Sequence, residues 1–173
     1  MPSPTAASSS RWAVWLATGL GAGYLPKMPG TYGSVEGVIV FLALETGTRS
    51  LGLGRIGLAL ALVLAVVVLT LLSVWITARA IPHFSSNDPQ VIVIDEIAGQ
   101  SVTLLALAFW PSSAEWNWMH VAAGFALFRI FDISKPLFIR SLDKLPGAWG
   151  VVADDIGAGV VGGLLLCGWG YFT

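Results

Sequence analysis

The strongest constraint on the fold is an uncharged run of 23 residues, from Ile56 to Ala78, that lies between Arg55 and Arg79. As a helix it rises about 35 Å, enough to cross the ~30 Å hydrocarbon layer of a bilayer. The rest of the chain is similarly apolar: 55% of its 173 residues are hydrophobic and 11% are charged, whereas soluble domains carry about 25% charged residues. The sequence therefore predicts an integral membrane protein.

Four further apolar segments carry polar residues near one end; they are residues 34–48, 95–110, 118–132 and 153–172. Together with the uncharged run, they predict an all-α, polytopic membrane bundle of about five apolar helices, three to five of which span the bilayer. Residues 1–10 are rich in Ser, Pro and Ala, which predicts a disordered N-terminal tail. We expect residues 11–173 to form a single membrane-embedded domain.

The positive charges predict which way the helices run. Residues 111–118 contain no Lys or Arg, whereas residues 129–144 contain four such residues. Cytoplasmic loops carry an excess of positive charge, so we expect residues 129–144 on the cytoplasmic side. Alternating spans then bring the acidic ends of three consecutive segments to that same face of the membrane.

Five carboxylates fall at this face, and they are Asp95, Glu96, Asp132, Asp154 and Asp155. Each has a plain explanation, because acidic residues in a first helical turn favour the helix dipole, and Asp132 can pair with Arg129 three residues earlier. Five converging carboxylates, however, repel one another unless cations compensate them. Oxygen ligands without a Cys or His cluster indicate a hard cation. The sequence therefore predicts a Mg²⁺ site.

Two other groups of residues have the chemistry to bind phosphate. The segment PKMPGTYGS, residues 26–34, predicts a Gly-rich turn followed by a helix that Ser34 caps. Such a turn offers backbone N–H groups to an anion, although an ordinary turn is the alternative. Arg129 and Lys135 are the cationic candidates. The expected phosphate contacts are Gly30, Thr31, Gly33, Ser34, Arg129 and Lys135.

Four blocks of the sequence are similar to a known family. GAGYLPKMPGTYGS, DPQVIVIDEIAG, FRIFDISKP and GAWGVVADDIGAG follow one another between residues 21 and 159. In these blocks the chain resembles the phosphatidylglycerophosphatase A family of bacterial membrane phosphatases. Ile94 stands where the family often has Trp, and this chain has the segment DISKPLFIR where a pattern like KPWPI is more common in the family. These departures affect the expected preference for lipid tail or head group more than the chemistry.

The resemblance implies an all-α enzyme of the bacterial inner membrane whose active site faces the cytoplasm. It implies Mg²⁺-dependent hydrolysis of the phosphomonoester of phosphatidylglycerophosphate, which gives phosphatidylglycerol and inorganic phosphate. On this basis the five carboxylates are expected to ligate the metal or support its ligands, and one of them is expected to position the attacking water. Arg129 and Lys135 are expected to contact phosphate.

Other functions fit the sequence less well. The net charge of −1 gives no attraction for nucleic acid, and the single cysteine, Cys167, is not followed by the Arg that a cysteine phosphatase needs. The main alternative is an ion-coupled transporter or a divalent-metal channel that uses the carboxylates. The expected partners are the membrane and a phospholipid substrate, and the sequence leaves the oligomeric state open.

Overall fold

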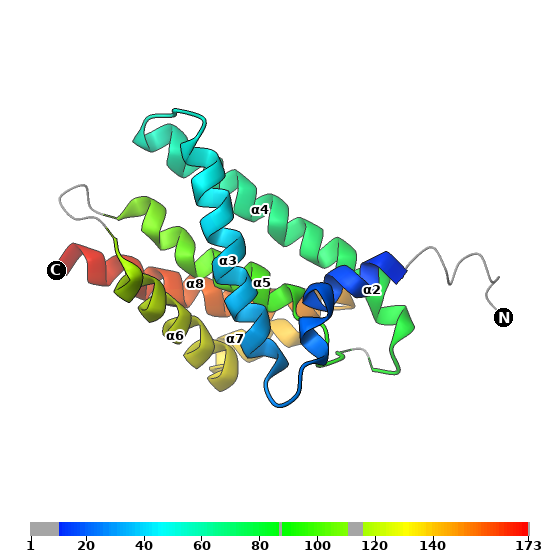
Figure 1. Ribbon diagram of the computed structural model, residues 1–173. Helices are drawn as coiled ribbons and strands as arrows, with labels where there is room; N and C mark the ends of the chain where they lie inside the picture. Colours follow the sequence, from blue (N-terminus) through cyan, green and yellow to red (C-terminus); the bar gives the residue numbers. More distant parts are fainter. Residues whose placement is uncertain (1–10, 87, 111–115, 173) are drawn as a thin grey trace.

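The computed structural model describes residues 11–86, 88–110 and 116–172, and the regular structure in these ranges is all helical (Figure 1). The tail expected at residues 1–10 lies outside the described residues, as do residues 111–115 of the loop used for orientation. The elements in chain order are α2 (Arg11–Ala17), η1 (Gly19–Tyr24), α3 (Pro29–Arg49), α4 (Arg55–Ala80), η2 (Ile81–His83), α5 (Ile94–Leu104), η3 (Leu105–Phe109), α6 (Trp118–Ser134), α7 (Leu137–Arg140), η4 (Leu142–Lys144) and α8 (Ala148–Phe172).

Two helices, not five, combine the length and hydropathy of a membrane span in the described residues. They are the continuous helical stretch Arg55–His83, which contains α4, and α8. The expectation of three to five spans is not confirmed, since α5, with 11 residues, rises only about 16 Å. Helix α6 has 17 residues, and α3 has 21 residues but includes Glu36 and Glu45. All five expected segments are nevertheless helical.

Helix α4 presents an apolar surface to the outside of the bundle. Ile56, Leu60 and Leu64 are 78%, 65% and 64% exposed, and Trp75 near the other end is also exposed. Contiguous apolar surface of this kind is uncommon on soluble monomers and marks a contact with membrane or protein. The outward face of α4 is therefore suited to lipid, in agreement with association of the chain with a membrane.

Helix α3 begins earlier than the sequence predicts. Pro29 occupies its first turn, where the missing N–H of proline costs nothing. Ser34 is inside the helix, fully buried, and its hydroxyl donates to the Gly30 carbonyl at 2.8 Å. The expected Ser34 cap and the Gly-rich turn at Gly30 and Gly33 were therefore wrong, because both glycines belong to the first turns of α3.

Helix α5 lies at the centre of the bundle and packs against α3, α4, α6 and α8. Its approach to α8 depends on glycine: a methyl group at Gly99 would lie 2.6 Å from the Asp155 carbonyl oxygen. One turn further on, the Thr103 hydroxyl donates to the Gly159 carbonyl at 3.2 Å. Helices α3, α5 and α8 begin at the end of the bundle where α6 finishes (Figure 1). The polar residues of four helices are thereby brought to one end.

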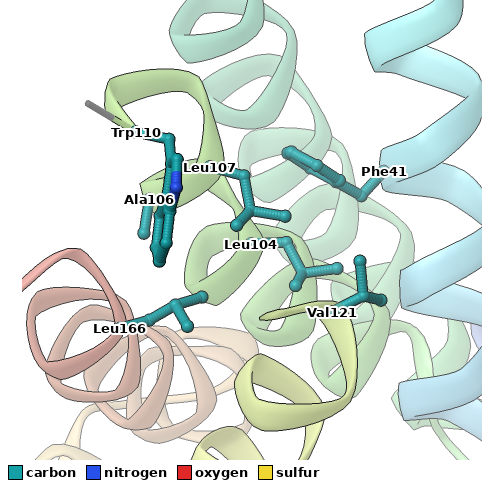
Figure 2. Packing of buried hydrophobic residues seen from close by; sticks show 7 residues of the cluster. All are labelled: Phe41, Leu104, Ala106, Leu107, Trp110, Val121 and Leu166. Carbon is teal, nitrogen blue, oxygen red and sulfur yellow. The ribbon is translucent and has the colours of Figure 1, made fainter. Parts of the chain in front are cut away.

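The opposite end of the bundle holds a cluster of buried apolar side chains (Figure 2). It draws on the later part of α3, on α5 and η3, on the first turn of α6 and on the later part of α8. The cluster consists of Phe41, Leu104, Ala106, Leu107, Trp110, Val121 and Leu166. Burying side chains of this size supplies roughly 1.5–3 kcal/mol each, so this core holds the helices together and leaves the other end free for polar residues.

Candidate metal and phosphate site

A cavity of about 850 Å³ opens at the polar end of the bundle. Its wall includes the start of α3, the first turn of α5, the last turns of α6 and the start of α8. Within the described residues, seven carboxylates and three cationic side chains lie in this wall. The carboxylates expected from the sequence are Asp95, Glu96, Asp132, Asp154 and Asp155, and the others are Asp88 and Asp143. The cationic side chains are Lys27, Arg129 and Lys135. Segments far apart in the chain thus converge on one polar cavity.

Three of the carboxylates form the tightest group. Asp95, Glu96 and Asp155 each offer one oxygen, and these oxygens all lie within 4.8 Å of one another. Asp95 and Asp155 are only 8% and 4% exposed. None of the three forms an ion pair with any described residue. This geometry brings three negative groups together in a place where water screens them poorly.

The electrostatics of α5 follow from this crowding. Burial raises the pKa of Asp95 well above its usual range, and the charges of Glu96 and Asp155 raise it further. Burial also raises the pKa of Glu96. Protons are therefore held more tightly than on free carboxyl groups. A divalent cation would relieve the same repulsion, since oxygen-only ligand sets suit hard ions such as Mg²⁺.

Two oxygens in the site are left without a hydrogen-bond partner among the described residues. Glu96 Oε2 and Asp154 Oδ1 are both buried. Buried polar atoms are nearly always satisfied, and leaving one unsatisfied costs roughly 1–3 kcal/mol. These two atoms have the free lone pairs that a metal ion or its bound water requires. The residues of this site therefore fit an oxygen-ligated cation.

The last turns of α6 supply an ion pair beside the carboxylate group. Arg129 donates to Asp132, and its Nη1 also lies 3.4 Å from the Ser34 hydroxyl. Gly30 permits this approach, because a methyl group there would lie 3.0 Å from Arg129 Nη1 and would collide with the Glu96 carboxylate. The plain explanation that Arg129 and Asp132 pair with each other is correct, and the pair faces the cavity.

Lys135 ends α6 in a conformation that is uncommon for its residue type. Its φ of 37° is in the left-handed region, and Pro136 follows directly. Its ammonium pairs with Asp154 and lies 3.6 Å from Asp143 Oδ1. Burial favours the neutral amine, but the ion pair with Asp154 outweighs it and the pKa of Lys135 is raised. The side chain is therefore a fixed positive charge in the cavity wall.

The expected phosphate contacts divide into two groups. Gly30, Arg129 and Lys135 line the cavity, whereas Thr31, Gly33 and Ser34 are not among its lining residues. Gly33 packs against Val93 and Glu96 instead. A phosphate-binding role for any of the six residues stays a prediction.

Three cavity residues fall outside the expected site. Asp88, which precedes Pro89 in the loop before α5, lines the wall, and so do Lys27 and Asp143. Asp88 also forms a turn, because its backbone N–H donates to the Ser86 hydroxyl at 3.1 Å. The sequence offers little to single out Lys27 and Asp143. Lys27 lies within a PxxPG pattern, and Asp143 lies close to the GAWG block.

The chain matches a known protein family and several named proteins. The family model described as phosphatidylglycerophosphatase A matches residues 15–169. A relative from Escherichia coli with the name phosphatidylglycerophosphatase A is 37% identical over 159 residues, which cover 88% of this chain and 80% of that protein. One from Haemophilus influenzae with the same name is 33% identical over 150 residues, covering 84% and 80%.

A third relative has a different name. The protein from Bacteroides thetaiotaomicron is provisionally named a phosphatidylinositol-3-phosphatase and is 37% identical over 153 residues, which cover 88% of this chain and 90% of that protein. No solved structure shows a significant match to the chain. All three named relatives are thus described as phosphatases of phosphorylated lipids.

Proposed function

This chain belongs to the phosphatidylglycerophosphatase A family, and we propose that it hydrolyses the phosphomonoester of phosphatidylglycerophosphate in a Mg²⁺-dependent reaction. The family and the named relatives indicate a phosphatase. The products would be phosphatidylglycerol and inorganic phosphate. The alternative of an ion-coupled transporter or metal channel has no support from these relatives.

The three clustered carboxylates of Asp95, Glu96 and Asp155 give the strongest support for metal dependence. They would hold Mg²⁺, with the free oxygen of Asp154 beside them. When bound, the ion would neutralise negative charge on the phosphoryl oxygens and help to hold the attacking water. Asp132 lies in the same wall outside this cluster. The sequence predicts both a catalytic and a metal-ligand role for Asp132, and its place outside the three-carboxylate cluster favours the first.

The cationic residues have positions suited to binding the phosphomonoester. Arg129 and Lys135 both line the cavity, and each is held in place by a carboxylate. In the proposed reaction, water attacks phosphorus and the bond from phosphorus to the glycerol oxygen breaks. Asp132 accepts a proton from the water and passes it to the released glycerol oxygen, which returns Asp132 to its carboxylate form. Arg129 and Lys135 stabilise the charge on the non-bridging oxygens meanwhile.

The proposal extends to the position of the protein in the membrane. Helices α4 and α8 would cross the inner membrane, and the cavity would face the cytoplasm. Exposed apolar residues beside the cavity, among them Ile133 and Leu145, support a location near lipid. A substrate anchored in the bilayer could then reach the carboxylates with its head group while its acyl chains remain in lipid.

Phosphate release by the purified full-length protein in detergent micelles tests the proposal. We expect release from phosphatidylglycerophosphate with Mg²⁺ and none with excess chelator, and loss of roughly 10²-fold or more in turnover for Asp95→Asn. Glu45→Gln is the matched control, since Glu45 pairs with Arg49 at the far end of α3. Equal rates with and without chelator would contradict metal dependence. Faster release from phosphatidylinositol 3-phosphate would reassign the head group.

A further inference from the structure

Three cationic side chains line the cavity within the described residues, and they differ in their partners. Arg129 pairs with Asp132, and Lys135 pairs with Asp154 and lies near Asp143. Lys27 forms no ion pair with any described residue. Its positive charge is therefore available to an anionic group that enters the cavity.

The backbone directs Lys27 and the three residues after it to the cavity. Lys27 has a φ of 83°, in the left-handed region that an L residue with a side chain rarely adopts. It stands between Pro26 and the Met28–Pro29 pair that starts α3, and every residue from Lys27 to Gly30 lines the wall. Unfavourable backbone conformations persist where the surrounding structure requires them, often at ligand sites. Here the left-handed backbone at Lys27 directs residues 27–30 along the cavity wall.

Lys27 is a solvent-exposed part of the cavity wall. Its side chain is exposed, whereas Asp95 and Asp155 are buried. Its neighbours Leu25 and Met28 are apolar and 47% and 59% exposed. Lys27 thus stands between exposed apolar residues, of which Met28 also lines the cavity. A glycerophospholipid offers the complementary groups, because its anionic phosphodiester lies next to the glycerol that carries the apolar acyl chains.

We propose that Lys27 binds the inner phosphodiester of the lipid substrate while the terminal phosphomonoester lies at the carboxylates. This inference rests on the proposed phosphatase function. A cavity of about 850 Å³ has room for a head group that carries both phosphates. The diester is shared by phosphatidylglycerophosphate and phosphatidylinositol 3-phosphate, so the assignment of Lys27 holds for either head group. Lys27 is accordingly a substrate-positioning residue and not a participant in the chemical step.

Inhibition by the two reaction products separates the two phosphate positions. Phosphatidylglycerol retains the diester and lacks the monoester, whereas inorganic phosphate can occupy only the monoester position. For Lys27→Met we expect KM for phosphatidylglycerophosphate and the inhibition constant for phosphatidylglycerol to rise by the same factor, roughly three- to tenfold for an exposed charged contact. The inhibition constant for inorganic phosphate and kcat should stay unchanged. Lys27→Arg should restore most of the loss.

Lys144→Met is the matched control, because Lys144 is an exposed lysine that does not line the cavity. Added salt should reduce the difference between wild type and Lys27→Met, since exposed charges are screened. The proposal is overturned if inhibition by inorganic phosphate weakens as much as inhibition by phosphatidylglycerol, or if neither changes. Failure of the proposed function looks different: the wild-type protein itself would release no phosphate from phosphatidylglycerophosphate.

Discussion

Asp154 and Asp155 are adjacent in α8 but have different surroundings. Neighbouring side chains on a helix point about 100° apart, so the two carboxylates face different residues. Asp155 joins Asp95 and Glu96 in the carboxylate cluster. One oxygen of Asp154 pairs with Lys135, whereas the other has no hydrogen-bond partner among the described residues. The sequence predicts that the pair belongs to one site. The sequence does not predict which aspartate joins the cluster and which pairs with Lys135, because this depends on where α6 ends and on the left-handed turn at Lys135.

Substitution of the two aspartates should therefore have unequal effects on metal dependence. Asp155→Asn removes a charge from the three-carboxylate cluster, so we expect at least ~10²-fold lower turnover and a higher Mg²⁺ concentration for half-maximal rate. Asp154→Asn leaves that cluster intact and frees Lys135, so its half-maximal Mg²⁺ concentration should change less. Titration of Mg²⁺ in the phosphate-release assay measures both. Equal shifts in the two variants would show that Asp154 is a ligand of equal weight.

At the scale of the helix, the start of α3 lies earlier in the chain than the sequence predicts, and the reason is packing. Gly and Ser have low helix propensity, and PGTYGS reads locally as a turn. Packing overrides that preference, because Gly33 and Gly37 lie against Val93 and Gln100 and need small side chains. The five apolar segments were correctly assigned to helices because a long apolar run is a strong local signal. Contacts between helices set the boundaries and leave no comparable local signal.

Two glycines of α3 offer a direct comparison of packing and propensity. A methyl group at Gly30 would meet the Glu96 carboxylate and Arg129. At Gly47 it would meet no atom of the described residues within 4 Å, apart from its chain neighbours and the backbone of its own helix. We expect Gly47→Ala to raise the thermal midpoint slightly, since Ala is favoured over Gly by about 1 kcal/mol in a helix, and to leave the phosphatase rate unchanged.

Gly30→Ala should lower phosphatase activity substantially, because the Glu96 and Arg129 side chains must move to make room for the methyl group. Circular dichroism should show that its helix content is retained. Thermal melts and initial rates of phosphate release on the same two preparations provide the measurement. Full activity in Gly30→Ala would mean that the close contact between α3, Glu96 and Arg129 is not needed for turnover.

At the scale of the whole molecule, the acidic cluster lowers the stability of the metal-free protein. Burial raises the pKa of Asp95 and Glu96, so the folded protein binds more protons than the unfolded chain. By linkage, the metal-free protein loses stability as pH rises from the usual carboxyl range toward the raised pKa values. Mg²⁺ bound as we propose would compete with these protons. We therefore expect the rise in thermal midpoint on adding Mg²⁺ to be small at acidic pH and larger as pH increases.

Thermal melts across a pH series, with Mg²⁺ and with chelator, measure this linkage. The triple variant Asp95→Asn, Glu96→Gln, Asp155→Asn is the control, because it removes the charges that titrate. Its midpoint with chelator should depend less on pH and should not respond to Mg²⁺. A Mg²⁺-induced shift that is independent of pH, or one that survives in the triple variant, would place the metal elsewhere.

The membrane arrangement is the feature of the whole molecule for which sequence and structure differ most. Hydropathy gave five candidate segments, whereas α5 and α6 are short and lie beside α8. Their apolar residues serve partly to pack the bundle: Leu104 and Val121 are buried in its core. Apolar runs of 10–17 residues have the same composition in a protein core and in a membrane. Composition indicates association with a membrane, but helix length and contacts are needed to count the candidate spans.

Helix α4 gives the sharpest test of topology. Its 26 residues rise about 39 Å, more than the ~30 Å of the hydrocarbon layer, so its two ends should lie on opposite sides. Ser50 is exposed before its first residue, and Lys144 is exposed at the cavity end of the bundle. In a Cys167→Ser background, Ser50→Cys should react with an impermeant maleimide in intact spheroplasts, and Lys144→Cys only after permeabilisation. The reverse pattern would place the cavity outside the cytoplasm, and reaction of both from one side would show that α4 does not cross.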